Sequence, residues 1–130
     1  MRLPDDCRYS KQHEWIRVEG DGGTVGITDH AQKELGDVVF VELPEIGQAF
    51  AADEVLANVE SVKAVSEVYA PVAGEVLAVN SNLDSSPELV NEDPYGEAWF
   101  VRIRLVDSSD LDNLLTADQY RKYVEEESAG

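Results

Sequence analysis

Lys63 is the residue whose setting in this sequence most strongly indicates chemistry. It lies between two runs typical of β-strands, Glu54–Ser61 and Val65–Tyr69, in a chain with only ten basic residues. Because the runs are so close in sequence, we expect them to form a hairpin with Lys63 at or near its tip. An amine at such a tip is solvated, has a free stem and can be reached by the active site of another enzyme. We therefore interpret Lys63 as a covalent attachment point.

Two other roles for Lys63 remain open on the residues alone. It could be a solubilising lysine in a loop, which is the ordinary role of a loop lysine. A catalytic Schiff-base lysine is the third option, but that chemistry needs burial to depress the amine pKa. The connection Val62-Lys63-Ala64 lacks Gly, Asn and Asp, the usual residues of a two-residue hairpin turn. Ordinary turn propensity therefore does not explain why these residues form the connection.

The other reactive side chains form no familiar catalytic or metal motif. The two histidines, His13 and His30, fall in separate predicted elements, and no Cys-x-x-Cys or His-Glu-x-x-His spacing occurs. No Gly-x-Ser-x-Gly is present, and Gly20–Gly26 does not fit a phosphate-binding loop. With 27 carboxylates, some acidic pairs must lie close by chance. We expect no catalytic residue, no metal site and no independent enzyme activity.

The charge balance excludes several classes of partner. Ten basic residues face 27 acidic ones, for a net charge of −17. Nucleic-acid affinity depends on phosphate contacts with basic residues, and anionic membrane surfaces repel negative proteins. We therefore expect no nucleic-acid or membrane partner. Solubility alone would explain the charge, although proteins with basic faces remain suitable partners.

The N-terminal segment and the single cysteine suggest the bacterial cytoplasm. Cys7 has no cysteine to pair with, which fits a reducing compartment, and we assign it no chemistry. Met1–Ser10 has no apolar core typical of a secretory signal, and no apolar run has the length of a membrane span.

The pattern of short alternating runs predicts a mainly β protein. We expect Asp29 to cap a short helix that ends at Gly36, with a further short helix at Pro87–Val90. On the strand Glu54–Ser61, we expect Val55, Ala57 and Val59 to share one face. The predicted strands are His13–Glu19, Thr24–Thr28, Asp37–Leu43, Glu54–Ser61, Val65–Tyr69, Glu75–Val79 and Ala98–Leu105.

The C-terminal part changes to a helical period. Ser109–Leu115 and Thr116–Glu127 read as helices, and Thr116 with Gln119 resembles a capping box. Core-facing positions there are predicted at Leu114, Leu115, Tyr120 and Val124. We expect one domain over residues 1–130, with a lead-in over about 1–8, helices over about 109–127 and a frayed tail at 128–130.

At Lys63 the sequence resembles the glycine cleavage H-protein family. Glu60-Ser61-Val62-Lys63-Ala64 is similar to the lipoylation motif of that family. Gly47 and Gly74 stand sixteen residues before and eleven after Lys63, where lipoyl and biotinyl domains typically carry glycine. Further matching stretches are His13–Trp15, Val25–Ala31, Leu35–Pro44, Tyr69–Val76 and Leu89–Gly96.

The resemblance implies a lipoyl-type barrel-sandwich hybrid of two antiparallel sheets, with a short internal helix and C-terminal helices. We expect Gly47 and Gly74 to lie where the chain turns between sheets, in the positive-φ conformation that glycine adopts without cost.

The resemblance also implies a cofactor and a set of partners. Lipoate would be joined to Lys63 as an amide, and the arm would carry an aminomethyl group. The implied partners are a pyridoxal-phosphate glycine decarboxylase, a tetrahydrofolate-dependent aminomethyltransferase, a dihydrolipoyl dehydrogenase and a lipoyl ligase or transferase. In the family, the loaded arm folds into a cleft on its own carrier. By analogy, Glu14 would hold the amine, and Glu67 and His30 would line the same cleft. At position 12 this chain has Gln where some relatives have Ser, so the family's contact at that position is not implied.

Three other kinds of carrier protein share features with this sequence. A biotin carrier shares the fold, but its lysine is normally flanked by methionines, whereas Val62 and Ala64 flank Lys63. A lipoyl domain of a 2-oxoacid dehydrogenase would usually continue into a flexible linker. A lipoyl-relay or regulatory homologue, which would serve other lipoate-dependent complexes, is not distinguished by sequence.

Overall fold

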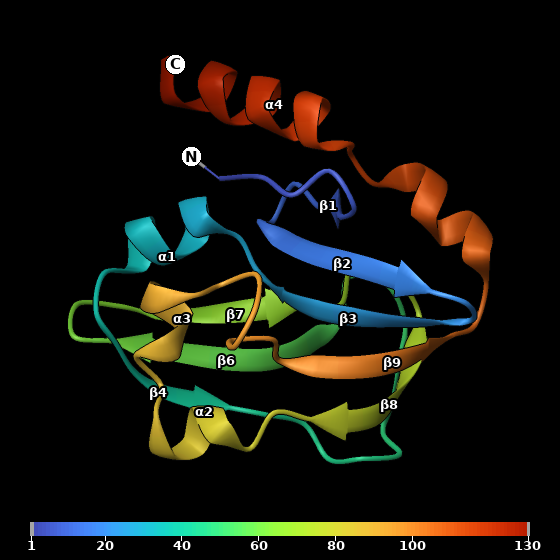
Figure 1. Ribbon diagram of the computed structural model, residues 1–130, viewed down its shortest axis with the longest axis horizontal. Coiled ribbons are helices and arrows are strands. Elements are labelled where there is room, and N and C mark those ends of the chain that lie inside the picture. The colour runs from blue at the N-terminus through green and yellow to red at the C-terminus, as the bar shows by residue number, and fades with distance from the viewer. Residues whose placement is uncertain (1, 130) are drawn as a thin grey trace.

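Two antiparallel β-sheets form the body of the protein in a computed structural model that describes residues 2–129 (Figure 1). This confirms the predicted mainly β fold of two antiparallel sheets. The smaller sheet has the order β4 (Val38–Glu42), β6 (Val55–Ser61), β7 (Val65–Tyr69). The larger sheet has the order β1 (Arg8–Tyr9), β2 (Glu14–Glu19), β3 (Gly22–Ile27), β9 (Val101–Leu105), β8 (Gly74–Val79), β5 (Ala49–Phe50).

Alternating side chains build the core between the sheets. On β9, Val101 and Ile103 are buried, whereas Arg102 and Arg104 are exposed. Burying each large apolar side chain contributes roughly 1.5–3 kcal/mol to folding. From the other sheet, β6 and β7 contribute Val59 and Val68 to the same core.

The strand β6 departs from its predicted alternation. Leu56 and Ala57 are both buried, while Val55 is 39% exposed. The register of β6 against β7 shifts between Val55 and Ala57, which marks a bulge. The prediction that Val55 shares a face with Ala57 and Val59 was therefore wrong, because one extra residue reverses the alternation.

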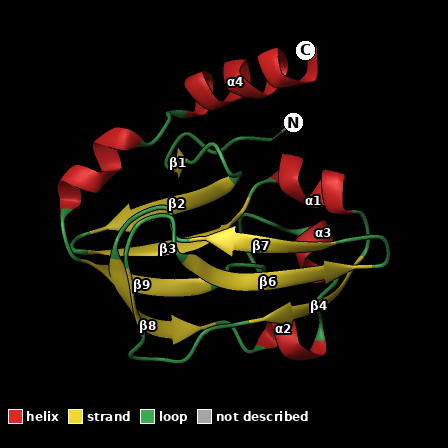
Figure 2. Cartoon of the chain, turned by 180° about the vertical axis from the view of Figure 1, so that it is seen from behind, coloured by secondary structure: helices red, strands yellow, loops and turns green. Residues whose placement is uncertain are grey.

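Short helices close one end of the sheets. They are α1 (Asp29–Leu35), α2 (Asn82–Ser85) and α3 (Leu89–Glu92). Figures 1 and 2 both place α1 and α3 at the end where β6 turns into β7. The cap of α1 is Thr28, whose Oγ1 accepts a hydrogen bond from Ala31 N at 3.2 Å, and not Asp29 as predicted. Asp29 instead accepts a bond from Gln32 within the first turn.

The C-terminal segment packs on the outside of β1 (Figure 1). A 3-10 helix, Ser108–Asn113, replaces the predicted helix over Ser109–Leu115, and α4 covers Ala117–Ala129. The capping box is confirmed, since Thr116 N donates to Gln119 Oε1 at 2.9 Å and Gln119 N donates to Thr116 Oγ1 at 3.2 Å. The helix continues two residues past its predicted end, and Gly130, in the predicted frayed tail, lies outside the described residues.

A second apolar cluster joins α4 to the N-terminal segment. Tyr120 and Val124 are buried in it as predicted, and the half-buried Leu115 packs against it. Leu114 is also buried as predicted, but in the core between the sheets. Leu3 and Cys7 are also buried, so the N-terminal lead-in is part of the packed structure. The further buried members of this cluster are Tyr9, Trp15, Tyr95 and Ala117.

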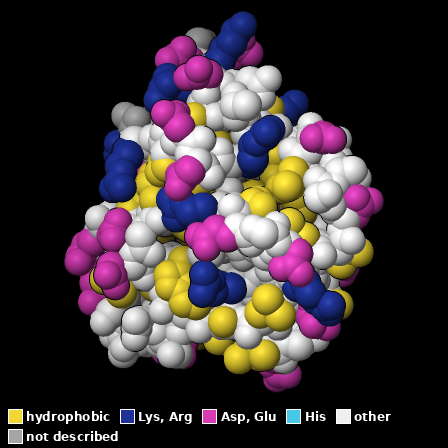
Figure 3. Space-filling view, turned by 45° about the vertical axis from the view of Figure 1, so that its right-hand side comes forward, with side chains coloured by type: hydrophobic (Ala, Val, Ile, Leu, Met, Phe, Trp, Pro, Cys, Tyr) yellow, Lys and Arg dark blue, Asp and Glu magenta, His cyan; other side chains and the backbone are white. Residues whose placement is uncertain are grey.

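The surface mixes charges of both signs on the face in Figure 3. Ion pairs also bring opposite charges together elsewhere in the structure: Arg104 on β9 lies 3.0 Å from Glu75 on β8, and Arg17 on β2 lies 2.8 Å from Asp6 in the turn before β1. None of the helices in residues 2–129 combines the length and apolar character needed to cross a membrane.

Gly47 and Gly74 serve different physical needs. Gly47 has φ +92°, as predicted. Gly74 is not among the positive-φ residues of the described chain, so that prediction was wrong. At Gly74 a Cβ atom would lie 2.9 Å from the carbonyl oxygen of Arg104 on β9. Glycine is required there because two backbones approach closely.

Gly74→Ala should therefore lower the free energy of unfolding by about 1–3 kcal/mol, because backbone must move to admit the methyl group. Gly22→Ala is the matched control, since its Cβ would lie 3.2 Å from the Ile103 carbonyl and needs a smaller shift. Urea denaturation of both variants measures the difference. Equal losses would contradict the close-approach explanation.

Candidate functional site

The hairpin tip at Lys63 is closed by a serine side chain. Ser61 N donates to Ala64 O at 2.8 Å, so Ser61–Ala64 forms the turn between β6 and β7. The buried Ser61 Oγ accepts hydrogen bonds from Ala64 N at 3.1 Å and Lys63 N at 3.4 Å, and donates to Ala64 O at 3.2 Å. This hydroxyl uses its donor and both lone pairs. It explains how the turn forms without Gly, Asn or Asp.

The Lys63 side chain is exposed, as predicted for a hairpin tip. It lies over Gly36, where an added Cβ would be 3.2 Å from Lys63 Cε. The Lys63 amine belongs to none of the ion pairs within residues 2–129. The amine is therefore presented without a carboxylate partner.

Asn91 on α3 fixes the loop beneath Lys63. Its side-chain nitrogen donates to Gly36 O at 2.8 Å and to Gln32 Oε1 at 3.0 Å. Its oxygen accepts from Val38 N at 2.9 Å. One amide thus links α1, β4 and α3, and the loop cannot move without breaking these bonds.

A cleft of about 420 Å³ opens beside this turn. Its lining begins at Ala64, the residue after the lysine, and continues along β7 to Val68. Such a volume is typical of small-molecule sites. The other lining residues are Gln12, His13, Glu14, Ile27, Ala31, Glu34, Leu35, Val59 and Glu127.

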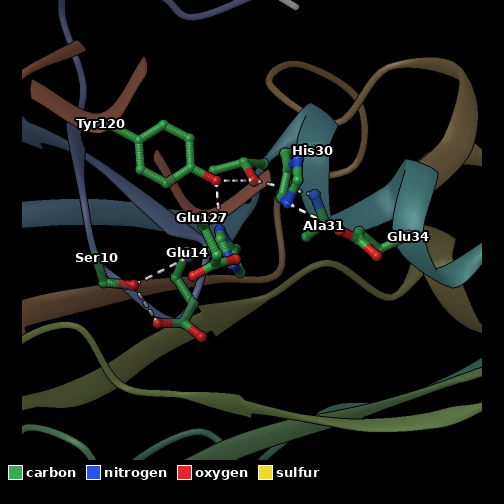
Figure 4. Close-up of polar contacts among 9 residues, drawn as sticks. Ser10, Glu14, His30, Ala31, Glu34, Tyr120 and Glu127 are labelled. Atoms are coloured by element: carbon green, nitrogen blue, oxygen red, sulfur yellow. Dashed lines mark hydrogen bonds and ion pairs between the residues drawn. The ribbon is translucent and has the colours of Figure 1, made fainter. Parts of the chain in front are cut away.

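Glu14 is the buried carboxylate of this cleft (Figure 4). Its side chain is 1% exposed. Oε1 accepts a hydrogen bond from Ser10 Oγ at 2.5 Å, and Oε2 accepts from Tyr69 N at 3.3 Å. Burial raises the pKa of Glu14 to about 7, although both hydrogen bonds lower it. The site therefore holds a carboxylate whose charge is poorly compensated.

The other two predicted cleft residues have different positions. Glu67 lines the cleft but is exposed, and its Oε1 accepts a bond from Tyr69 Oη at 3.3 Å. His30 is not among the lining residues. Its ring packs against His13 with a centroid distance of 4.7 Å, and His13 itself lines the cleft.

A polar chain holds His13 at the rim of the cleft. His13 Nδ1 lies 2.7 Å from Tyr120 Oη, which lies 2.8 Å from Thr28 Oγ1. The backbone of His13 has φ +72°, a conformation uncommon for residues other than glycine. Burial, and then the neighbouring His30, lower the pKa of His13.

The sequence reasoning missed the contribution of α4 to this site. Glu127 on α4 lines the cleft, and Tyr120 fixes His13. The two residues are seven apart, so they lie on one helix face. This spacing is visible in the sequence, but no pattern there predicts which element the helix packs against.

Ser61→Ala should leave the turn amides of Lys63 and Ala64 without their acceptor, and lower the free energy of unfolding by about 1–2 kcal/mol. Amide hydrogen exchange should show faster exchange at these two residues. Ser66→Ala, a half-buried serine on β7, is the matched control. Unchanged exchange at the turn would contradict the role of Ser61.

Glu14→Gln should become relatively more stable as the pH rises. The folded protein binds the Glu14 proton more tightly than the unfolded chain, whose carboxyl pKa is near 4.5. The wild type therefore has this stability in full below about pH 4.5, and loses it as the pH rises through about 7. Glutamine does not titrate, so the variant's stability relative to wild type should rise by roughly 2–3 kcal/mol between pH 5 and pH 8.

Urea denaturation of both proteins at the two pH values checks this expectation. A difference between variant and wild type that does not change with pH would show that Glu14 titrates alike in the folded and unfolded chains.

Comparison with known proteins places this geometry in a family. Residues 7–127 match the family model described as glycine cleavage H-protein. The glycine cleavage system H protein of Rubrobacter xylanophilus is 58% identical over 125 residues, covering 96% of this chain and 97% of that protein. The one from a Geobacillus species is 56% identical and covers 97% and 99%.

A solved structure agrees with the sequence comparisons. The crystal structure of a glycine cleavage system H protein from Mycobacterium marinum superposes with a TM-score of 0.86 at 36% identity, and covers 97% of this chain and 99% of that one. The chain therefore belongs to the glycine cleavage H-protein family.

Proposed function

We propose that the protein is the lipoyl carrier of a glycine cleavage system, with lipoate joined to the Lys63 amine as an amide. The observation that carries the proposal is an exposed amine at a hairpin tip, with no ion pair within residues 2–129, beside a cleft lined by a buried carboxylate. Membership of the glycine cleavage H-protein family supports the same role.

The residues around Lys63 fit such an attachment. Forming the amide removes the ammonium charge, and this amine has no ion pair in the described chain to lose. The exposed side chains of Val62 and Val65, 71% and 69% accessible, flank the lysine. They give an attaching enzyme apolar surface to contact without unfolding the hairpin.

The cleft suits an arm with a hydrocarbon stem and a polar end. Ile27, Leu35 and Val68 give its wall apolar surface, and Glu14 supplies a carboxylate fixed by two hydrogen bonds. In a partly dry cleft, an ammonium group pairs favourably with such a carboxylate. Glu14 would hold the amine of a loaded arm there, and the walls would exclude water from it.

The protein would act as a carrier and not as an enzyme. When bound, lipoate supplies a disulfide that takes up and releases the aminomethyl group, while the protein supplies presentation and shelter. The partners on this proposal are glycine decarboxylase, the aminomethyltransferase, dihydrolipoyl dehydrogenase and a lipoyl ligase or transferase, in the bacterial cytoplasm. Tethering raises the local concentration of the arm at each docked active site.

Lys63→Arg should abolish lipoylation while the fold survives, because an arginine keeps the charge but offers no acylable amine. Co-expression with a lipoyl ligase followed by intact mass measurement checks it. Lys33→Arg, at an exposed lysine on α1, is the control and should still gain one lipoyl group. A lipoyl-sized mass increase in the Lys63 variant would refute the assignment.

Assay of the lipoylated protein with purified glycine decarboxylase separates this function from a lipoyl relay. A glycine cleavage carrier should support release of carbon dioxide from glycine. A protein that is lipoylated but does not support this reaction would instead be a relay or regulatory homologue.

A further inference from the structure

Three side chains with metal-binding atoms converge at the rim of the cleft. His13 precedes β2, His30 is in α1 and Glu127 is in α4, and one ligand atom of each lies within 4.8 Å of the others. Figure 4 shows Glu127 and His30 on the same side of Tyr120. The expectation of no metal site rested on the absence of a metal-binding motif and on the two histidines falling in separate elements. Their convergence depends on how those elements pack, which the sequence does not reveal.

One nitrogen of the His30 imidazole is buried and lacks a hydrogen bond in the described part of the chain. Nε2 is shielded from solvent and forms no hydrogen bond within the described residues. Glu34 Oε1 lies 3.1 Å from it, close enough for an ion pair but outside hydrogen-bonding geometry. A buried ring nitrogen with no hydrogen bond is costly, and a bound ligand at this nitrogen would offset that cost.

His13 is already oriented as metal-binding histidines usually are. Its Nδ1 is held by Tyr120 Oη at 2.7 Å, and the Tyr120 hydroxyl is held by Thr28 Oγ1 at 2.8 Å. The other nitrogen, Nε2, lies 3.5 Å from Glu127 Oε1. With Nδ1–H donating to Tyr120, Nε2 would be free to bind a metal, which is the common outer arrangement of a metal site.

We propose that His13, His30 and Glu127 bind a zinc ion, with Glu34 as the fourth ligand. Imidazole nitrogens and carboxylate oxygens in a four-coordinate set suit Zn²⁺, with bonds of about 2.0–2.2 Å. Ligand atoms around such an ion are about 3.3 Å apart. Two of the existing separations are already 3.1 Å and 3.5 Å. Glu127 and Glu34 are exposed, with 46% and 68% of their side chains accessible, so they can close the remaining distance.

A bound ion would join the two walls of the cleft. His13, Glu34 and Glu127 all line it, and they come from the chain before β2, from α1 and from α4. Zinc would therefore tie α4 to α1 across the rim. Zinc binding itself does not depend on the proposed lipoyl function, and the two can fail separately.

The test is titration calorimetry of the full, unlipoylated chain with Zn²⁺ in excess Mg²⁺. Magnesium prefers oxygen ligands, so it occupies weak sites on the acidic surface and leaves a histidine site free. We expect one Zn²⁺ per chain. His30→Gln and Glu127→Gln should each weaken binding at least about tenfold, as even loss of an outer-shell partner does. Glu126→Gln, the exposed neighbour on α4, is the matched control and should bind as wild type does.

A second measurement tests the proposal even if the His30→Gln variant fails to fold. Glu127 is exposed, so its replacement should not unfold the chain, and Co²⁺ bound by a tetrahedral site gives visible absorption that should be lost in Glu127→Gln. Cys7→Ala should retain binding, because the buried Cys7 thiol, with its pKa raised to about 12, is a poor ligand. Absence of stoichiometric binding in the wild type, or equal affinity in Glu127→Gln and Glu126→Gln, would overturn the proposal.

Discussion

The Ser61 hydroxyl is the interaction on which the rest of the site depends. It forms three hydrogen bonds within the turn Ser61–Ala64 and so replaces the glycine or asparagine that a tight hairpin normally needs. The lysine can then lie at the tip with its side chain outside. Asn91 holds the underlying loop at Gly36, so the amine rests on a surface fixed from three elements. A rigid base with a free amine is what covalent attachment requires.

Burial of Glu14 carries a cost in stability that binding of an amine in the cleft would offset. Ser10 and the Tyr69 amide satisfy the carboxylate, yet burial still raises its pKa to about 7. A charge that is expensive in the empty cleft becomes favourable when a cation enters. The cost would then be recovered only when an amine is bound. The same reasoning applies to the rim, where a buried nitrogen of His30 forms no hydrogen bond within residues 2–129.

Local patterns predicted most of the strands and the placement of Lys63, because alternation and proximity decide a hairpin. Predictions from local patterns were wrong where the conformation depends on residues distant in sequence. The bulge in β6 reverses the face of Val55, and the backbone of β9 demands glycine at position 74. Thr28 caps α1 in place of Asp29, and its Oγ1 also lies 2.8 Å from Tyr120 Oη on α4, a contact that no local pattern reveals. The same helix brings Glu127 to the cleft, whereas His30 on α1 packs against His13 and does not line the cleft, so the cleft could be predicted only in part.

Peptide mapping by mass spectrometry of the protein purified from its native cells tests the central claim most directly. The chain has four lysines, Lys11, Lys33, Lys63 and Lys122. The account predicts a lipoyl amide on the peptide that contains Lys63 and unmodified amines at the other three. An unmodified Lys63 in cells that carry lipoate on other proteins, or lipoate on a different lysine, would contradict it.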